Sequence, residues 1–160
     1  MVDWRKLFFR NISRPRVIFT LWMVFQNCLL TKDSMRNHGL ITNGIFALCN
    51  LQESCHQLFF ECAATKEVWK HILAGIGDLH NPGGWKTELA WIIQQTRGKG
   101  SRIKLLKMVI AETVYHIWTV RNKIIFQNCN KDIFHSKHIR EMMLGRIDMD
   151  RELVAYCDRM

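Results

Sequence analysis

The stretch on which the interpretation of this sequence depends covers residues 44–69 and reads GIFALCNLQESCHQLFFECAATKEVW. It holds three cysteines and a histidine around a Leu-Phe-Phe triplet, and it continues into an amphipathic segment. Cysteine sulfur and histidine nitrogen are ligands that zinc prefers, and a structural zinc site needs four of them in a tetrahedron. The candidate metal ligands are therefore Cys49, Cys55, His56 and Cys62.

The spacing of these four residues leaves two interpretations open. Zinc ligands usually come as close pairs, whereas the pattern here is Cys-x5-Cys-His-x5-Cys. Adjacent residues such as Cys55 and His56 point to different sides of a regular helix. Either the four side chains bind zinc, or Cys49 and Cys62 are small buried apolar residues and His56 is exposed.

Helical patterns precede this stretch. Asp3 can cap a short helix through WRKLFFR, and Pro15 suits the first turn of the next one. The segment 17–29 is apolar nearly all round, which predicts the central helix of the core. A short helix is expected to start near residues 31–33 and to end at Gly39.

Helical patterns also follow it. Thr65 is the expected N-cap of a helix that ends near residue 76, and residues 85–95 form another amphipathic segment. The longest helix is expected over residues 102–126 with Ser101 as its N-cap, and a last one from about residue 132.

Apolar and polar residues do not alternate with a period of two over any sustained stretch, so little or no sheet is expected. The sequence predicts a mainly α, irregular single-domain helical fold with a loop-helix segment that carries the Cys/His cluster. Residues 1–96 are expected to form the region around that cluster. Residues 97–160, which begin with the basic linker RGKGS, are expected to supply C-terminal helices packed on it.

The composition is that of a globular protein with a basic surface. The chain has 160 residues, of which 48% are hydrophobic and 23% charged, and its net charge is +9. The excess of Lys and Arg lies in residues 1–50 and 97–140, which suits RNA or DNA as a partner, although a solvated basic surface without a partner has the same composition. The candidate phosphate contacts are Arg14, Arg16, Lys32, Arg102, Lys104, Lys107, Arg121 and Lys123. For Arg121, helix packing or capping is the alternative role.

Several motifs along the chain carry a family resemblance. They are Trp4, PR-x-x-F at 15–19, Trp22, LLTKD at 29–33, Gly39, ES-x-x-x-LFF-x-C at 53–62, Val68-Trp69 and VYHIWTVRNKIIF at 114–126. In this order they resemble the zinc-binding region that follows the reverse transcriptase in plant LINE-type (non-LTR) retroelements. The resemblance implies zinc as a cofactor and RNA or DNA as a partner.

The family pattern reads Cys-x-x-Cys, then Glu-Ser/Thr-x-x-His-Leu-Phe-x-x-Cys. Carried over to this chain, its second and last cysteines are Cys49 and Cys62, whereas Phe46 and Gln57 occupy the other two ligand positions. The resemblance therefore implies a degenerate zinc site, in which Phe46 fills space with apolar bulk and Gln57 can still form hydrogen bonds.

No catalytic constellation is recognisable, and RGKGS lacks the spacing of a phosphate-binding P-loop. The resemblance places polymerase activity in a separate upstream domain, so a non-enzymatic role without a small-molecule substrate is expected. The alternative is a relic or interaction module that binds neither metal nor nucleic acid. With no signal peptide and no apolar run longer than that ending at Leu30, the expected location is the nucleus or cytoplasm, with reduced cysteines.

Overall fold

The computed structural model describes residues 3–46 and 49–129, so the helix predicted from about residue 132 lies outside the described residues. The elements follow one another as η1 (Asp3–Leu7), α1 (Pro15–Phe25), α2 (Lys32–Asn37), η2 (Gln57–Glu61), α3 (Ala63–Gly75), α4 (Trp85–Gln95) and α5 (Ser101–Phe126). Of these, η1 is a 3-10 helix and η2 is a π-helical turn.

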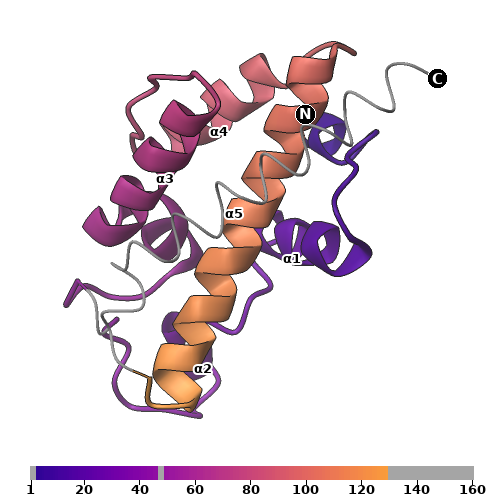
Figure 1. Cartoon of the computed structure of the whole chain (residues 1–160). Coiled ribbons are helices and arrows are strands. Elements are labelled where there is room, and N and C mark those ends of the chain that lie inside the picture. The colour runs from indigo at the N-terminus through magenta and orange to yellow at the C-terminus, as the bar shows by residue number, and fades with distance from the viewer. Residues whose placement is uncertain (1–2, 47–48, 130–160) are drawn as a thin grey trace.

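The central element is α5, which runs through the middle of the molecule between α1 on one side and α3 and α4 on the other (Figure 1). Half of its residues are buried, including an uninterrupted run from Leu106 to Val114. The expectation that residues 17–29 form the central helix is wrong. Helix α1 is amphipathic, because Phe19 and Trp22 are 57% and 42% exposed and stack on each other at the surface.

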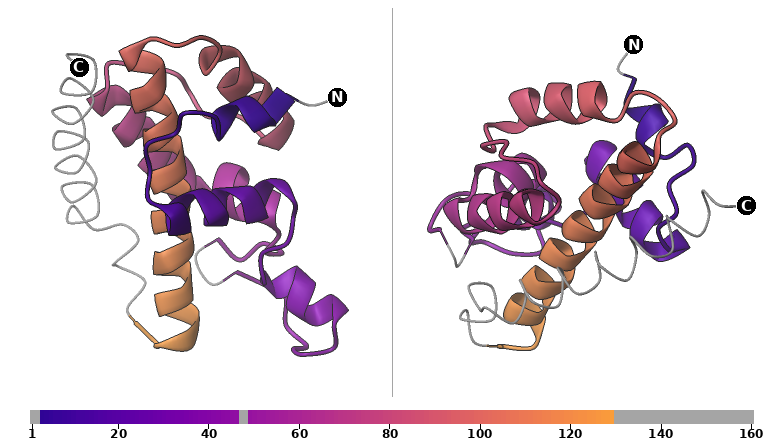
Figure 2. Two further views of the ribbon diagram at one scale, coloured as in Figure 1. Left: turned by 90° about the vertical axis from the view of Figure 1, so that its right-hand side faces the viewer. Right: turned by 45° about the horizontal axis from the view of Figure 1, so that its top comes forward.

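The other helices are arranged around α5. Helix α1 crosses it, and α3 packs on it from another direction (Figure 2). Helix α4 contacts both η1 and η2, so it joins the N-terminus of the chain to the Cys/His segment. A single apolar core results, to which α1, η2, α3 and α5 contribute most of the buried side chains.

The Leu-Phe-Phe triplet forms the π-helical turn η2. Leu58, Phe59 and Phe60 are all buried, and the indole nitrogen of Trp69 donates a hydrogen bond to the carbonyl oxygen of Phe59 at 2.8 Å. The Phe60 and Trp69 rings stack with their centroids 5.8 Å apart. These contacts fix the Cys/His segment against α3.

Two predicted N-caps need correction by one to three residues. Helix α3 starts at Ala63 with Cys62 as its N-cap, and the hydroxyl group of Thr65 instead donates to the Cys62 carbonyl oxygen at 2.9 Å inside the first turn. Gly100, not Ser101, is the N-cap of α5. Helix α4, by contrast, has the bounds that its pattern predicts.

The prediction of a mainly α fold is confirmed. Over residues 3–46 and 49–129 the only β-type pairing is an isolated antiparallel bridge between Ile45 and Gln52. Within the same ranges, no helix combines the length and the apolar character that crossing a lipid bilayer requires.

Candidate functional site

Three of the four positions that the family pattern reserves for zinc ligands lie close together. The side-chain amide nitrogen of Gln57 donates to the sulfur of Cys49 at 2.6 Å, and the Cys62 backbone N–H donates to the Gln57 carbonyl oxygen at 2.8 Å. Burial raises the pKa of the Cys62 thiol, and the neighbouring Cys49 thiol adds to this effect. Phe46, at the fourth position, is fully buried in the same core as Cys62.

Cys55 and His56 are directed elsewhere. Cys55 is buried beside Asp33 and Glu53, and burial, followed by the charge of Asp33, raises the pKa of its thiol to about 12. The imidazole of His56 is exposed and stacks on Trp85, with ring centroids 4.5 Å apart. Neither side chain therefore replaces the ligands missing at positions 46 and 57.

The residues present do not fit a tetrahedral zinc site. Among the residues that the structure describes, no group of three or more His, Cys, Asp or Glu side chains could hold a metal ion. The amide oxygen of Gln57 is buried without a hydrogen-bond partner, which costs about 1–3 kcal/mol for a neutral polar group. The Cys49, Gln57 and Cys62 cluster provides two thiols and one amide, whereas a tetrahedral zinc site needs four ligands.

A second buried polar centre lies a few residues earlier, where Glu53 pairs with Arg121 of α5. Both side chains are fully buried, and the guanidinium binds both carboxylate oxygens, with Arg121 Nε 3.3 Å from Glu53 Oε2 and Nη2 in contact with Oε1. Arg121 Nη1 also donates to Asn122 Oδ1 at 2.8 Å, and the guanidinium lies 4.7 Å from the Trp118 ring. Such bidentate pairing satisfies two ions that would otherwise be costly to bury.

The same pair orders the chain around α2. Glu53 Oε1 accepts a hydrogen bond from the Lys32 backbone N–H at 2.8 Å, so a carboxylate lies at the N-terminus of α2, where the helix dipole favours negative charge. The Asp33 N–H donates to the Glu53 carbonyl oxygen at 3.1 Å. The prediction that Arg121 contacts phosphate is corrected, because its guanidinium is buried and bound to Glu53; the alternative of a packing role describes it.

The remaining predicted phosphate contacts are scattered. Arg14 pairs with Glu112 at 3.0 Å, Arg102 pairs with Asp78 at 3.2 Å, and the Lys32 ammonium donates to the Ile45 carbonyl oxygen at 2.7 Å.

Arg16 is exposed and lies over the Tyr115 ring, and Lys123 is exposed near the C-terminal end of α5. At 1.5 Å per residue, Lys123 is about 29 Å from Lys104 along the helix, so these cations do not form one patch.

A concave basic site lies where η1 meets the connection between α4 and α5. It has a volume of about 330 Å³, and we call it the basic cavity. Its lining residues are Lys6, Phe9, Arg10, Thr96, Arg97, Gly98, Lys99, Ile103, Lys104 and Lys107. Of the predicted contacts only Lys104 and Lys107 are among them, and no acidic residue is included in this described lining.

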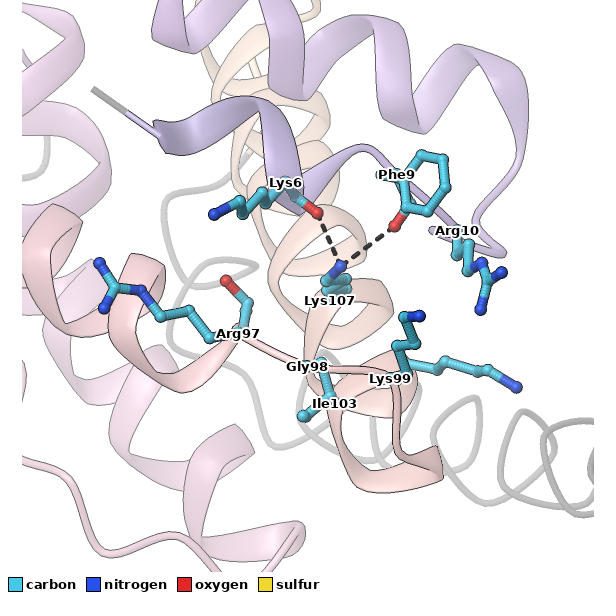
Figure 3. A pocket seen from close by; sticks show the side chains of 10 residues that line it. Lys6, Phe9, Arg10, Arg97, Gly98, Lys99, Ile103 and Lys107 are labelled. Atoms are coloured by element: carbon cyan, nitrogen blue, oxygen red, sulfur yellow. Dashed lines mark hydrogen bonds between the residues drawn. The ribbon is translucent and has the colours of Figure 1, made fainter. Parts of the chain in front are cut away.

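Lys107 marks the floor of the basic cavity. Its side chain is almost fully buried, and its ammonium donates to the carbonyl oxygens of Lys6 at 2.6 Å and Phe9 at 3.0 Å (Figure 3). Burial lowers the pKa of Lys107, and the nearby positive charge of Arg10 lowers it further. An ammonium has three donors, so one N–H remains beyond these two carbonyl contacts.

Sequence reasoning missed Lys6, Arg10, Arg97 and Lys99. The sequence does contain a signal for them: WRKLFFR at 4–10 combines three basic with three aromatic residues, and RGKGS at 97–101 is a glycine-rich basic segment. The two segments are about ninety positions apart in the sequence. Only the packing of η1 against α4 brings them together.

Comparison with known families gave a match, and it covers the part of the chain that holds Cys49, Gln57 and Cys62. The family model described as zinc-binding in reverse transcriptase matches residues 1–69. This match confirms the predicted resemblance over that segment, and it includes all four family ligand positions as well as Glu53. Comparisons with curated proteins and with solved structures gave no match. The family-matched segment is thus related to a zinc-binding domain associated with reverse transcriptases, whereas α4 and α5 lie beyond the match.

Proposed function

We propose that this chain is a non-catalytic, retroelement-derived domain that binds RNA or DNA by their phosphates at the basic cavity. The observation that carries the proposal is the composition of that cavity, where six Lys and Arg residues and no acidic residue line a space of about 330 Å³. Like charges gathered in a concavity raise the local positive potential and attract polyanions. In a helper domain of a reverse transcriptase, such a site would hold template RNA or target DNA.

The location of the other charges supports the choice of this surface. Arg14, Arg102 and Arg121 each have a carboxylate partner, which reduces the field that they contribute outside the protein. Lys99 and Arg97, by contrast, are exposed in the connection just before α5. The N-terminus of α5 has no side-chain cap, so the positive end of its dipole adds to theirs.

The test uses the full chain and a 20-nucleotide fluorescein-labelled RNA in a fluorescence anisotropy titration at several KCl concentrations. Contact with phosphates predicts that log K falls linearly with log salt. The Arg97→Glu/Lys99→Glu variant is expected to weaken binding about tenfold or more and to lower the salt slope by about 2. The matched control is Lys66→Glu/Lys70→Glu on α3, which changes the charge equally at residues outside the cavity lining.

Binding that is undetectable at low salt would reject the proposal. So would equal losses in the cavity variant and in the α3 control, because the effect would then depend on net charge alone. That result would favour an interaction module without affinity for nucleic acid.

The proposed domain does not need zinc. The support is the arrangement at the family ligand positions, where Phe46 is buried and Gln57 donates to the Cys49 sulfur. Metal analysis of protein purified without chelator should find well below one zinc per chain. About one zinc per chain that is lost in Cys62→Ser would contradict this part of the proposal.

A further inference from the structure

We infer that the basic cavity takes one unpaired nucleotide of a single strand, with its base on the Phe9 ring and its neighbouring phosphates on the surrounding cations. The inference rests on the proposed function and specifies which form of nucleic acid the site prefers.

The first observation is the exposure of Phe9. Phe9 is one of the residues that line the cavity, with its carbonyl oxygen on the Lys107 ammonium and its ring pointing away from that ammonium at the rim (Figure 3). It is 65% exposed, whereas the adjacent Phe8 is half-buried and packs on the core. The Arg10 guanidinium lies 5.4 Å from the centre of the Phe9 ring. The exposed ring, with Arg10 over one face, is a stacking surface that every base can use, because each base has a π-face.

The second observation is the distribution of charge around that ring. In Figure 3 the side chains of Lys6 and Arg97 extend to one side of the Lys107 ammonium, and those of Arg10 and Lys99 extend to the other. Consecutive phosphates of a strand that crosses the opening would therefore meet cations on both sides. The remaining N–H of Lys107 provides a donor at the floor between them.

The third observation is the shape of the wall. Gly98 has a φ of 113°, a conformation that residues with a side chain rarely adopt, and it lets the connection fold back towards Ile103 of α5. The resulting volume of about 330 Å³ is at the lower end of the range for small-ligand sites. A paired base cannot offer its face to Phe9 without leaving its stack, which costs free energy in a duplex and little in a flexible single strand.

The test compares a fluorescein-labelled single-stranded 12-mer of deoxythymidine with a 12-base-pair duplex, using the full chain at one salt concentration. Phe9→Ala is expected to weaken single-strand binding about tenfold and to leave duplex binding within about twofold, because only the stacking contact is lost. Phe9→Leu, which keeps apolar bulk without a ring, should behave like Phe9→Ala, and Phe9→Trp should retain the preference.

Phe19→Ala is the matched control, since Phe19 is a similarly exposed phenylalanine on α1, outside the cavity lining. It should leave both affinities unchanged. If both oligonucleotides bind but Phe9→Ala does not change their ratio, this inference fails while the proposed function stands. If the wild-type chain binds neither, both fail. Circular dichroism spectra that match the wild type would show that each variant is folded.

Discussion

Two polar centres come from the same short stretch of sequence and differ in how completely their groups are paired. Glu53, at the start of ES-x-x-x-LFF-x-C, is fully buried with both carboxylate oxygens bound by Arg121 and a further hydrogen bond from Lys32. Four residues later, Gln57 donates to the Cys49 sulfur but leaves its own amide oxygen buried and without a partner.

The difference indicates which of the two centres contributes more to the stability of the fold. A buried charge without its partner is far more costly than a buried amide with one unmet hydrogen bond. Replacing only one member of the Glu53–Arg121 pair is therefore expected to be strongly destabilising, whereas the Cys49, Gln57 and Cys62 cluster contains no buried charge that needs a partner.

The largest effect should come from breaking the Glu53–Arg121 pair on one side. Arg121→Ala leaves the Glu53 carboxylate buried without its counterion, so the free energy of unfolding should fall by about 3–5 kcal/mol. Urea denaturation followed by tryptophan fluorescence measures the loss.

The double variant Glu53→Gln/Arg121→Met is the control for that experiment. It removes both charges, keeps an acceptor near the Lys32 N–H and fills a similar volume, so it should lie within about 1 kcal/mol of the wild type. A double variant as unstable as Arg121→Ala would show that the ion pair itself is not the source of the effect.

A somewhat smaller effect is expected from rebuilding the other centre. Phe46→Cys/Gln57→His places cysteine or histidine at all four family ligand positions, and zinc should then bind. At a free zinc concentration a hundred times Kd, binding would raise the free energy of unfolding by about 2.7 kcal/mol. Thermal unfolding with and without zinc measures the shift. A zinc-dependent shift of the same size in the wild-type chain would contradict the conclusion that its residues do not fit a tetrahedral zinc site.

The unpartnered amide of Gln57 predicts a modest stabilisation. Gln57→Leu removes the buried unpaired oxygen and also the N–H donor to Cys49, with a net gain of about 1 kcal/mol in the free energy of unfolding. Gln94→Leu, at an exposed position of α4, is the control and should change stability by less than about 0.5 kcal/mol. A loss of stability in Gln57→Leu would mean that the amide–sulfur hydrogen bond dominates.

The smallest perturbation is chemical labelling, which leaves the fold intact. The thiol of Cys55 has its pKa raised from 9.0 to about 12 by burial, so at pH 8 its thiolate fraction is lower by about a thousandfold. Cys49 is only half-buried. Iodoacetamide at pH 8 should therefore label Cys49 well before Cys55, as measured by peptide mass spectrometry. Equal rates would indicate that the two centres open together.

Helix content could be predicted well from the sequence, and the place of each helix in the core less well. The 85–95 segment has the bounds that its apolar spacing and its flanking glycines indicate. The central role expected for residues 17–29 was wrong, because an apolar composition does not reveal that Phe19 and Trp22 pair with each other at the surface. The π-helical form of Gln57–Glu61 has no signature in the spacing of its residues; in the structure Trp69 donates to the Phe59 carbonyl oxygen and stacks on the Phe60 ring.

The candidate site, too, could be predicted only in part from the sequence. The family pattern predicts that Phe46 and Gln57 stand at ligand positions, and in the structure Gln57 lies against both Cys49 and Cys62. Arg121 could not be distinguished from the surface cations, because the sequence does not show whether an arginine near a helix end is solvated or buried against Glu53. The basic cavity depends on contacts between residues of η1 and residues near 100, which local patterns do not contain.

The Glu53–Arg121 pair can form only late in the synthesis of the chain. The two residues are 68 positions apart, and a ribosome adds roughly 5–20 residues per second. Arg121 is therefore added to the chain about 3–14 seconds after Glu53. The family-matched segment, residues 1–69, thus leaves the ribosome without the helix that completes its interior. The end of the family match at residue 69 is therefore not the end of the folded core, because the core also contains α5 residues and can be completed only after α5 has been synthesised.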